Sequence, residues 1–170
     1  MNNSYISYNE STKKIITSFE VNKKIKENEL SEQNTKEVIE KVDKYLEEAG
    51  MFFLATVDVD QPKCRPLGLH ILHDDKIYFG VGDFKEVYHQ MEANPKVEIV
   101  ATKGEDILRY YGVAKFEDNP EVLEKTWEIL GELKALYDEN GWKMKLFYID
   151  DATAEFRNMF SVDESYNFKY

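Results

Sequence analysis

The fold is decided by residues 51–82, which read MFFLATVDVDQPKCRPLGLHILHDDKIYFGVG. Three runs that predict strands follow one another in this stretch, at 51–60, 63–75 and 76–82. Asp60-Gln61-Pro62 and Asp74-Asp75 separate the runs, and connections this short join antiparallel strands. The stretch therefore predicts an antiparallel meander rather than a parallel α/β repeat.

The flanking sequence adds three helices and four more strands to this meander. A helix is predicted from about Asn34 to Gly50, a short one after Asp83 as its N-cap, and a longer one from Asn119 to Asn140. The buried stripe of the long helix is expected to be Val122, Leu123, Trp127, Leu130 and Leu133. Strands are expected at 96–104 and 106–118, and two more around Asp150-Asp151. Seven strands with hairpin spacing predict a mainly β (α+β) fold, a curled antiparallel barrel with helices outside.

A length of 170 residues suits one domain with its own core. Residues 1–35 hold five Lys and five Glu and few aliphatic residues, so we expect an appended arm, anchored by Ile15, Ile16 and Phe19. The predicted organisation is therefore an arm at 1–35, a domain at 36–162 and a peripheral C-terminal tail at 163–170.

Charge and composition exclude several classes of function. The 22 basic and 33 acidic residues give a net charge of −11, which argues against binding to nucleic acid. No apolar run approaches the ~20 residues that span a membrane. Cys64 is the single cysteine, and the N-terminus lacks the pattern of a secretory signal, so a cytoplasmic location is expected. No metal site is expected, because His70 and His73 are three apart on a predicted strand and point to opposite faces.

Two cations occupy unusual positions. Arg65 lies inside an apolar strand, and Lys85 lies at the start of a helix, where the helix dipole disfavours a positive charge. One explanation is local neutralisation, by Asp83 and Glu86 for Lys85 and by an acid across the sheet for Arg65. The other is a phosphate group held at the helix start by both cations, beside Gly80 and Gly82.

Three motifs, in this order and spacing, resemble the pyridoxamine 5′-phosphate oxidase-like family of FMN-binding split barrels. They are the RP pair at 65–66, the YFG-x-G-x-x-K-x-x-Y segment at 78–88, and ANPKVEI at 93–99. The resemblance extends from about Glu37 to Phe160. It implies a six-stranded antiparallel Greek-key split β-barrel with flanking helices. It also implies a homodimer, with FMN in two symmetric sites between the protomers.

The resemblance also implies the residues that bind the cofactor. Arg65 and Lys85 would hold the FMN phosphate, and His70 would face the flavin. The ring system would lie against the strands that contain Pro66, Leu67, Gly68, Phe79 and Gly80. The partner would complete the pocket with the strand around Arg109 and Tyr111 or with the strand around Phe156. The chain departs from the family at Gly80, where Ser or Thr is frequent. It also ends in FRNMFSVDESYNFKY rather than in the Trp- and Arg-rich stretch that binds pyridoxamine phosphate.

The function expected from this resemblance is an FMN-dependent oxidoreductase acting on a small molecule. The flavin would carry the redox chemistry, and no side chain stands out as a catalytic acid or base. The alternative is a non-catalytic split barrel that binds or stores flavin or haem.

Overall fold

A computed structural model describes residues 7–9, 14–16 and 32–170. The strands β1 (Ser7–Asn9) and β2 (Lys14–Ile16) pair with each other in antiparallel register. The side chains of Ile15, Ile16 and Phe19, which the sequence predicts to anchor the arm, lie outside the described part. No helix in the described ranges is both long and apolar enough to cross a lipid bilayer.

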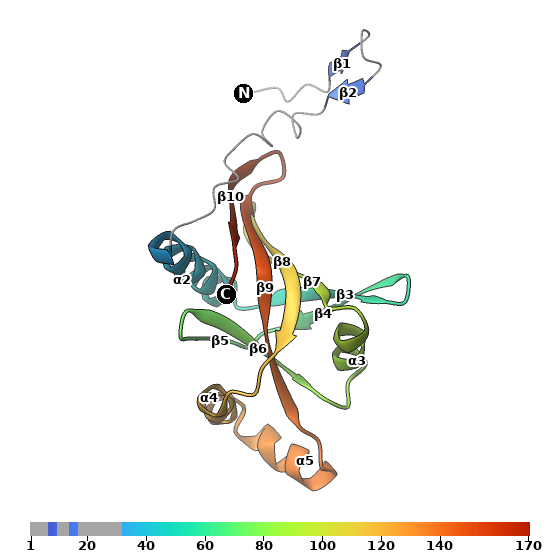
Figure 1. Cartoon of the computed structure of the whole chain (residues 1–170), viewed down its shortest axis with the longest axis vertical. Coiled ribbons are helices and arrows are strands. Elements are labelled where there is room, and N and C mark those ends of the chain that lie inside the picture. Colours follow the sequence, from blue (N-terminus) through green and yellow to red (C-terminus); the bar gives the residue numbers. More distant parts are fainter. Residues whose placement is uncertain (1–6, 10–13, 17–31) are drawn as a thin grey trace.

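One curled antiparallel sheet of eight strands forms the body of residues 32–170. Its members are β3 (Phe52–Asp58), β4 (Gln61–Leu67), β5 (His70–His73), β6 (Lys76–Gly82), β7 (Lys96–Lys103), β8 (Asp106–Phe116), β9 (Met144–Arg157) and β10 (Val162–Phe168). The order across the sheet is β4-β3-β7-β8-β9-β6-β5, and β10 pairs with β9. Figure 1 shows β9 running through the middle of the domain. The predicted mainly β split barrel is confirmed, with eight strands in place of six.

The sheet curls because its first and last members are joined directly. β4 and β5 are at opposite ends of the strand order, yet only Gly68 and Leu69 connect them. Three Cα–Cα steps span at most about 11 Å, so the two edges must approach each other. The sequence predicted one strand over 63–75, and this is wrong because the chain turns at Gly68 to pass from one edge to the other.

Alternation along the strands sorts side chains into an inner and an outer layer. On β6, Ile77, Phe79 and Val81 enter the main core, whereas Tyr78 joins a second cluster with Val122 and Leu146 on the other face. Helix α2 (Glu32–Ala49) covers the main core with a buried stripe at helical spacing: Val38, Ile39, Val42, Tyr45 and Leu46.

Strand β9 is continuous through Asp150-Asp151, where the sequence predicted two strands. The register with β8 shifts between Tyr111 and Val113, so the chain bulges opposite Gly112 and Asp151 takes a φ of 50°. A Cβ on Gly112 would lie 2.6 Å from the carbonyl oxygen of Asp150. Glycine at 112 therefore permits a bend within one strand, and the prediction of a turn is wrong.

The C-terminal segment is part of the sheet rather than a peripheral tail. β10 pairs with β9 from Val162↔Arg157 to Phe168↔Ala152. Phe168 is only 7% exposed and stacks on Tyr110 at 6.1 Å between ring centroids. The peripheral placement predicted for 163–170 is therefore wrong, because alternate residues of VDESYNFKY reach the core.

Two helix predictions also need correction. Helix α3 (Glu86–Ala93) has Lys85, not Asp83, at its N-cap position. The long helix is split into α4 (Pro120–Leu130) and α5 (Glu132–Asn140) at Gly131, whose φ is 27°. The predicted buried stripe is therefore mostly wrong: Val122 is buried, but Leu123, Trp127 and Leu130 are only half-buried. Leu133 lies beyond the break and is exposed.

Candidate functional site

Arg65 extends from the edge strand β4 across β3 to helix α3. Because Arg65 pairs with Leu54 in the register of β3 and β4, its side chain emerges on the same face as Leu54 and Thr56. Its Nη1 donates to the Leu54 carbonyl oxygen at 3.2 Å and to Thr56 Oγ1 at 2.6 Å. Its Nη2 donates to Gln90 Oε1 at 2.9 Å. The guanidinium is thus held between a strand and a helix.

The acceptors around Arg65 are all neutral. No carboxylate lies within ion-pair distance of its guanidinium in the described part of the chain. Burial lowers the pKa of Arg65 from its ordinary value, and the nearby Glu86 acts in the opposite direction. An arginine remains protonated at physiological pH even so. The site therefore carries a half-buried positive charge without a bonded counter-ion, and the predicted neutralisation by an acid across the sheet is wrong.

Thr56 and Gln90 are functional candidates that the sequence prediction missed. They are 2% and 7% exposed, and Thr56 Oγ1 donates to Gln90 Oε1 at 2.7 Å. Gln90 lies on the buried face of α3 with Val87 and Met91. A glutamine at an apolar position of an amphipathic helix was a usable signal, because a buried amide needs hydrogen-bond partners.

Lys85 lies at the start of the same helix. It occupies the N-cap position of α3, makes no capping hydrogen bond with its side chain, and is exposed. Lys85 precedes Gln90 by five positions, which corresponds to about 7.5 Å along a helix axis. α3 thus carries Lys85 at its N-cap position and, more than one turn further on, the Gln90 side chain that bonds Arg65.

The loop before α3 is fixed by the chain itself. A Cβ on Gly82 would lie 2.5 Å from Phe84 Cε1 and 2.7 Å from Tyr137 Oη. At Gly80 the corresponding neighbour is Met144 Sδ, at 3.0 Å. The space left by these two glycines is thus occupied by side chains of this protein rather than open to a ligand.

The remaining residues of the predicted ring-binding strands are placed as follows. Phe79 is buried in the barrel core between Phe52 and Phe147, so only its backbone is available to a ligand. Pro66 and Gly68 are exposed, and Leu67 packs partly against the core. These positions line the edge strand β4 and the turn that follows it.

His70, at the beginning of β5, faces inward toward α2. Its Nε2 lies 3.2 Å from Asp43 Oδ1, and its ring meets the Phe52 ring edge-on at 5.7 Å. Its Nδ1 is buried and has no hydrogen-bond partner in the described residues. The contact with Asp43 orients the ring toward the helix.

Arg109 and Tyr111 belong to a different group, on the outer face of β7, β8 and β9. Arg109 binds Glu98 through both Nε and Nη2, the latter at 3.0 Å, and the Tyr111 hydroxyl donates to Glu155 Oε1 at 3.1 Å. The hydrogen bond that Arg109 donates to Glu98 raises the pKa of Arg109, and burial together with Glu155 raises the pKa of Tyr111. Phe156 is on the inner face, where it packs edge-on against Tyr45. Within one chain, the structure does not bring these residues to Arg65.

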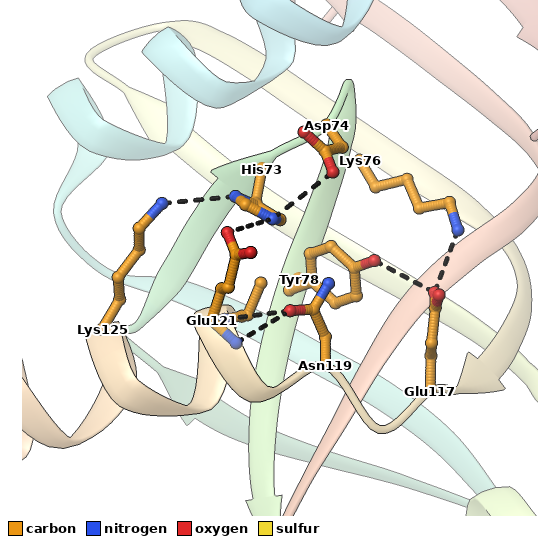
Figure 2. Close-up of polar contacts among 9 residues, drawn as sticks. His73, Asp74, Lys76, Tyr78, Glu117, Asn119, Glu121 and Lys125 are labelled. Carbon is orange, nitrogen blue, oxygen red and sulfur yellow. Dashed lines mark hydrogen bonds and ion pairs between the residues drawn. The ribbon is translucent and has the colours of Figure 1, made fainter.

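A second polar cluster joins the β5–β6 hairpin to α4 (Figure 2). Lys76 and the Tyr78 hydroxyl both donate to Glu117 Oε2, at 2.9 and 3.0 Å. The hydrogen bond from Lys76 lowers the pKa of Glu117, whereas burial raises the pKa of Tyr78. His73 Nε2 lies 3.5 Å from Glu121 Oε2. Lys76 and Glu117 form a direct ion pair, in contrast to Arg65, and the contact of His73 with Glu121 ties the hairpin to α4.

Comparison with known proteins gives the same fold. No curated protein sequence matches the chain. A NimC/NimA family protein from Clostridium acetobutylicum is 26% identical, with a TM-score of 0.69 over 82% of this chain and 100% of that one. General Stress Protein 26 from Bacillus anthracis is 20% identical, with a TM-score of 0.58 over 77% and 98%. A protein related to general stress protein 26 from C. acetobutylicum is 12% identical, with a TM-score of 0.57 over 79% and 95%.

The family comparison covers the residues that build the site. The sequence model described as pyridoxamine 5′-phosphate oxidase matches residues 38–145. This range includes β4 with Arg65, the loop with Lys85 and the whole of α3. Since the match extends over more than half of the chain, the protein belongs to the pyridoxamine 5′-phosphate oxidase family.

Proposed function

We propose that this protein is an FMN-binding oxidoreductase that acts on a small molecule. The observation that carries the proposal is the half-buried guanidinium of Arg65. It is held by Leu54, Thr56 and Gln90, and the described residues place no carboxylate in bonding distance of it. A charge kept unneutralised in a partly buried place favours an anionic ligand. FMN carries such an anion, its phosphate, and membership of the family supports flavin as the ligand.

The residues around Arg65 fit a phosphate. Arg65 offers a fixed fork of donors, and Lys85 adds an exposed ammonium at the N-cap position, where its side chain makes no capping hydrogen bond. The acidic Glu86 is also in the first turn of α3, so the two cations are needed to keep the local charge positive. Arg65 and Lys85 would bind the phosphate, and the backbone of β4 and β6 would support the ring system.

The redox step belongs to the cofactor in this proposal. Bound FMN supplies hydride or electron transfer, and the protein supplies binding, orientation and electrostatic tuning. The fixed guanidinium of Arg65 contributes charge and direction, and the loop at 82–85, held by Phe84 and Tyr137, contributes a rigid support. The net charge of −11 favours a small substrate over a nucleic acid.

We further propose that a second copy of the chain completes the site. The outer face of β3 presents Phe53, which is 46% exposed and pairs in register with Pro66 on β4 and Val100 on β7. The ion pair of Arg109 with Glu98 is on the same face, in register with Val100. A partly apolar face with a partly buried ion pair suits a symmetric homodimer contact.

The phosphate assignment is tested with FMN and riboflavin, which differ by the phosphate. Arg65→Met and Lys85→Met should each weaken FMN binding roughly 10- to 100-fold, because a charge-assisted hydrogen bond contributes about 1.5–3 kcal/mol. Riboflavin binding should change little. Lys134→Met, at an exposed pair with Asp138 on α5, serves as the control and should change neither ligand. Equal losses for both flavins would overturn the assignment.

The visible spectrum of the purified protein tests the class of cofactor. The proposal predicts the absorption bands of oxidised flavin and their bleaching by dithionite. A haem Soret band in place of them would support the non-catalytic haem-binding alternative. A bound flavin that reduces but turns over no donor or acceptor would support flavin storage.

The dimer is tested by light scattering against the chain mass of 20.0 kDa. Wild type should have twice that mass. Phe53→Asp should shift the protein toward the monomer and weaken FMN binding. Val59→Asp, at the exposed β3–β4 turn, should leave both unchanged. A wild-type monomer at micromolar concentration would overturn the proposed dimer.

A further inference from the structure

We infer that Thr56 and Gln90 are positioning residues that hold Arg65 with one edge of its guanidinium free for the phosphate. This inference rests on the proposed function, because it concerns the same anion site. The two acceptors, Thr56 Oγ1 and Gln90 Oε1, are 2.7 Å apart. Thr56 Oγ1 accepts a hydrogen bond from Nη1, and Gln90 Oε1 accepts one from Nη2. Both acceptors therefore lie at the outer end of the guanidinium, beyond its two terminal nitrogens.

Counting the N–H donors of Arg65 identifies the edge of the guanidinium that is available to a ligand. A guanidinium has five N–H groups, one on Nε and two on each terminal nitrogen. Nη1 uses both of its hydrogens, on the Leu54 carbonyl and Thr56, and Nη2 uses one on Gln90. One hydrogen on Nε and one on Nη2 are left without a partner among the residues that the structure describes. These two lie side by side on the lateral edge of the group.

The same lateral edge binds an anion elsewhere in this chain. Arg109 holds the Glu98 carboxylate with Nε on one oxygen and Nη2 on the other. A phosphate presents oxygens with a similar spacing and accepts the same bidentate contact. The edge of Arg65 that Thr56 and Gln90 leave unused is therefore the edge suited to a phosphate.

The choice of neutral acceptors matters as much as their position. A carboxylate at position 90 could hold Nη2 equally well, but it would cancel the charge of Arg65. Gln90 accepts the hydrogen bond and leaves that charge intact. Thr56 adds direction, since its hydroxyl donates to Gln90 while accepting from Arg65. This closed triangle fixes the amide with its oxygen toward Arg65.

The experiment compares FMN with riboflavin binding in the full-length protein stripped of flavin. The quantity measured is the FMN preference, the Kd for riboflavin divided by the Kd for FMN, from fluorescence quenching. Gln90→Glu should lower the preference at least tenfold, toward the value of Arg65→Met. The same variant should unfold at a temperature equal to or above that of wild type, because the new carboxylate pairs with Arg65. A merely structural role would move affinity and stability in the same direction.

Two threonine variants provide a second measurement. Thr56→Val removes an acceptor from Arg65 and should lower the FMN preference several-fold. Thr126→Val removes the other buried threonine hydroxyl, which bonds the Val122 carbonyl within α4. This control should lower the unfolding temperature and leave the FMN preference unchanged.

The outcomes separate the two claims. A preserved FMN preference in Gln90→Glu and Thr56→Val, with a loss in Arg65→Met, would overturn the positioning role and leave the proposed function standing. A wild type that binds neither flavin would overturn the proposed function and the inference with it. A wild type that binds both flavins equally would show that Arg65 contacts no phosphate, which also overturns the inference.

Discussion

Asp83 and Lys143 hold two distant segments together by exchanging two hydrogen bonds. The Asp83 backbone N–H donates to the Lys143 carbonyl at 2.9 Å, and the Lys143 N–H donates to Asp83 Oδ1, also at 2.9 Å. Asp83 follows β6 and precedes α3, whereas Lys143 directly precedes β9. These two bonds attach the loop that carries Lys85 to the start of β9. Asp83, which the sequence predicted to cap α3, therefore fixes this loop instead.

Asp83→Ala should lower the free energy of unfolding by about 1 kcal/mol, because the Lys143 N–H loses its acceptor. Asp83→Asn is the matched control, since its side-chain oxygen can still accept this bond and stability should stay near wild type. Urea denaturation followed by circular dichroism measures both. Similar losses in the two variants would show that charge, rather than the hydrogen bond to Lys143, is what stabilises the loop.

Three glycine-to-alanine variants should lose stability in the order of how closely the added Cβ would approach its neighbours. Gly112→Ala should be the most destabilising, at or above about 3 kcal/mol, because its Cβ would meet backbone oxygens of Asp150 and Asp151 at 2.6 and 2.9 Å. Gly82→Ala should cost about 1–3 kcal/mol, because Phe84 and Tyr137 must shift. Gly68→Ala should be neutral or slightly stabilising, since its nearest neighbour is 3.7 Å away. Thermal unfolding of the flavin-free proteins checks the order, and a Gly68→Ala as unstable as Gly112→Ala would contradict it.

Phe168→Ala should destabilise the protein by about 3–5 kcal/mol, because Phe168 is buried against Tyr110. Phe160 lies close by in sequence and is 66% exposed. Phe160→Ala should therefore change stability by no more than about 0.5 kcal/mol. Chemical denaturation distinguishes the two, and equal effects would mean that β10 contributes little to the core.

Glu117→Gln should reduce stability in a pH-dependent way. Lys76 and Tyr78 hold the pKa of Glu117 below its ordinary value of 4.5. A depressed folded-state pKa stabilises the protein above the unfolded-state pKa, and the stabilisation is lost as pH falls through the folded-state value. The difference between wild type and variant should therefore be largest near neutral pH and shrink below pH 4.5.

Unfolding measured between about pH 3 and pH 7 covers this window. Lys76→Met should produce the same pH dependence, and the double variant should lose less stability than the two single losses added together, because both remove one interaction. A difference that stays constant across the range would show that the carboxylate of Glu117 is not what the cluster depends on.

The local hydrophobic pattern predicted a strand or helix correctly wherever burial of one face left a regular period in that segment's own residues. The alternation in FFLATVD predicted β3, whose Phe52 and Leu54 are buried while Phe53 is exposed. The spacing of apolar residues likewise predicted α2, within two residues of its observed start at Glu32. These predictions succeed because burial on one face imposes a period that each segment shows by itself.

Predictions failed where the path of the chain depends on the rest of the sheet. The sequence predicted one strand over 63–75, yet the chain must turn at Gly68 because the curled sheet places β4 and β5 at its two edges. Asp150-Asp151 resembles a turn, but the bulge opposite Gly112 absorbs it within β9. Propensity describes a segment in isolation, and here tertiary pairing overrides it.

In the candidate site, too, some features follow from the local sequence and others only from the tertiary structure. The sequence by itself determined that Lys85 is a cation at a helix start, where the helix dipole disfavours it. The apolar strand expected around Arg65 is wrong, because β4 is an edge strand whose residues are exposed or half-buried. Only the tertiary structure decided what surrounds Arg65. Thr56 and Gln90 are 34 residues apart, and they meet because α3 packs against β3. The periodicity of a single segment cannot predict a contact between two distant segments. The neutral hydrogen-bond acceptors of Arg65 therefore follow only from the packing of α3 against β3.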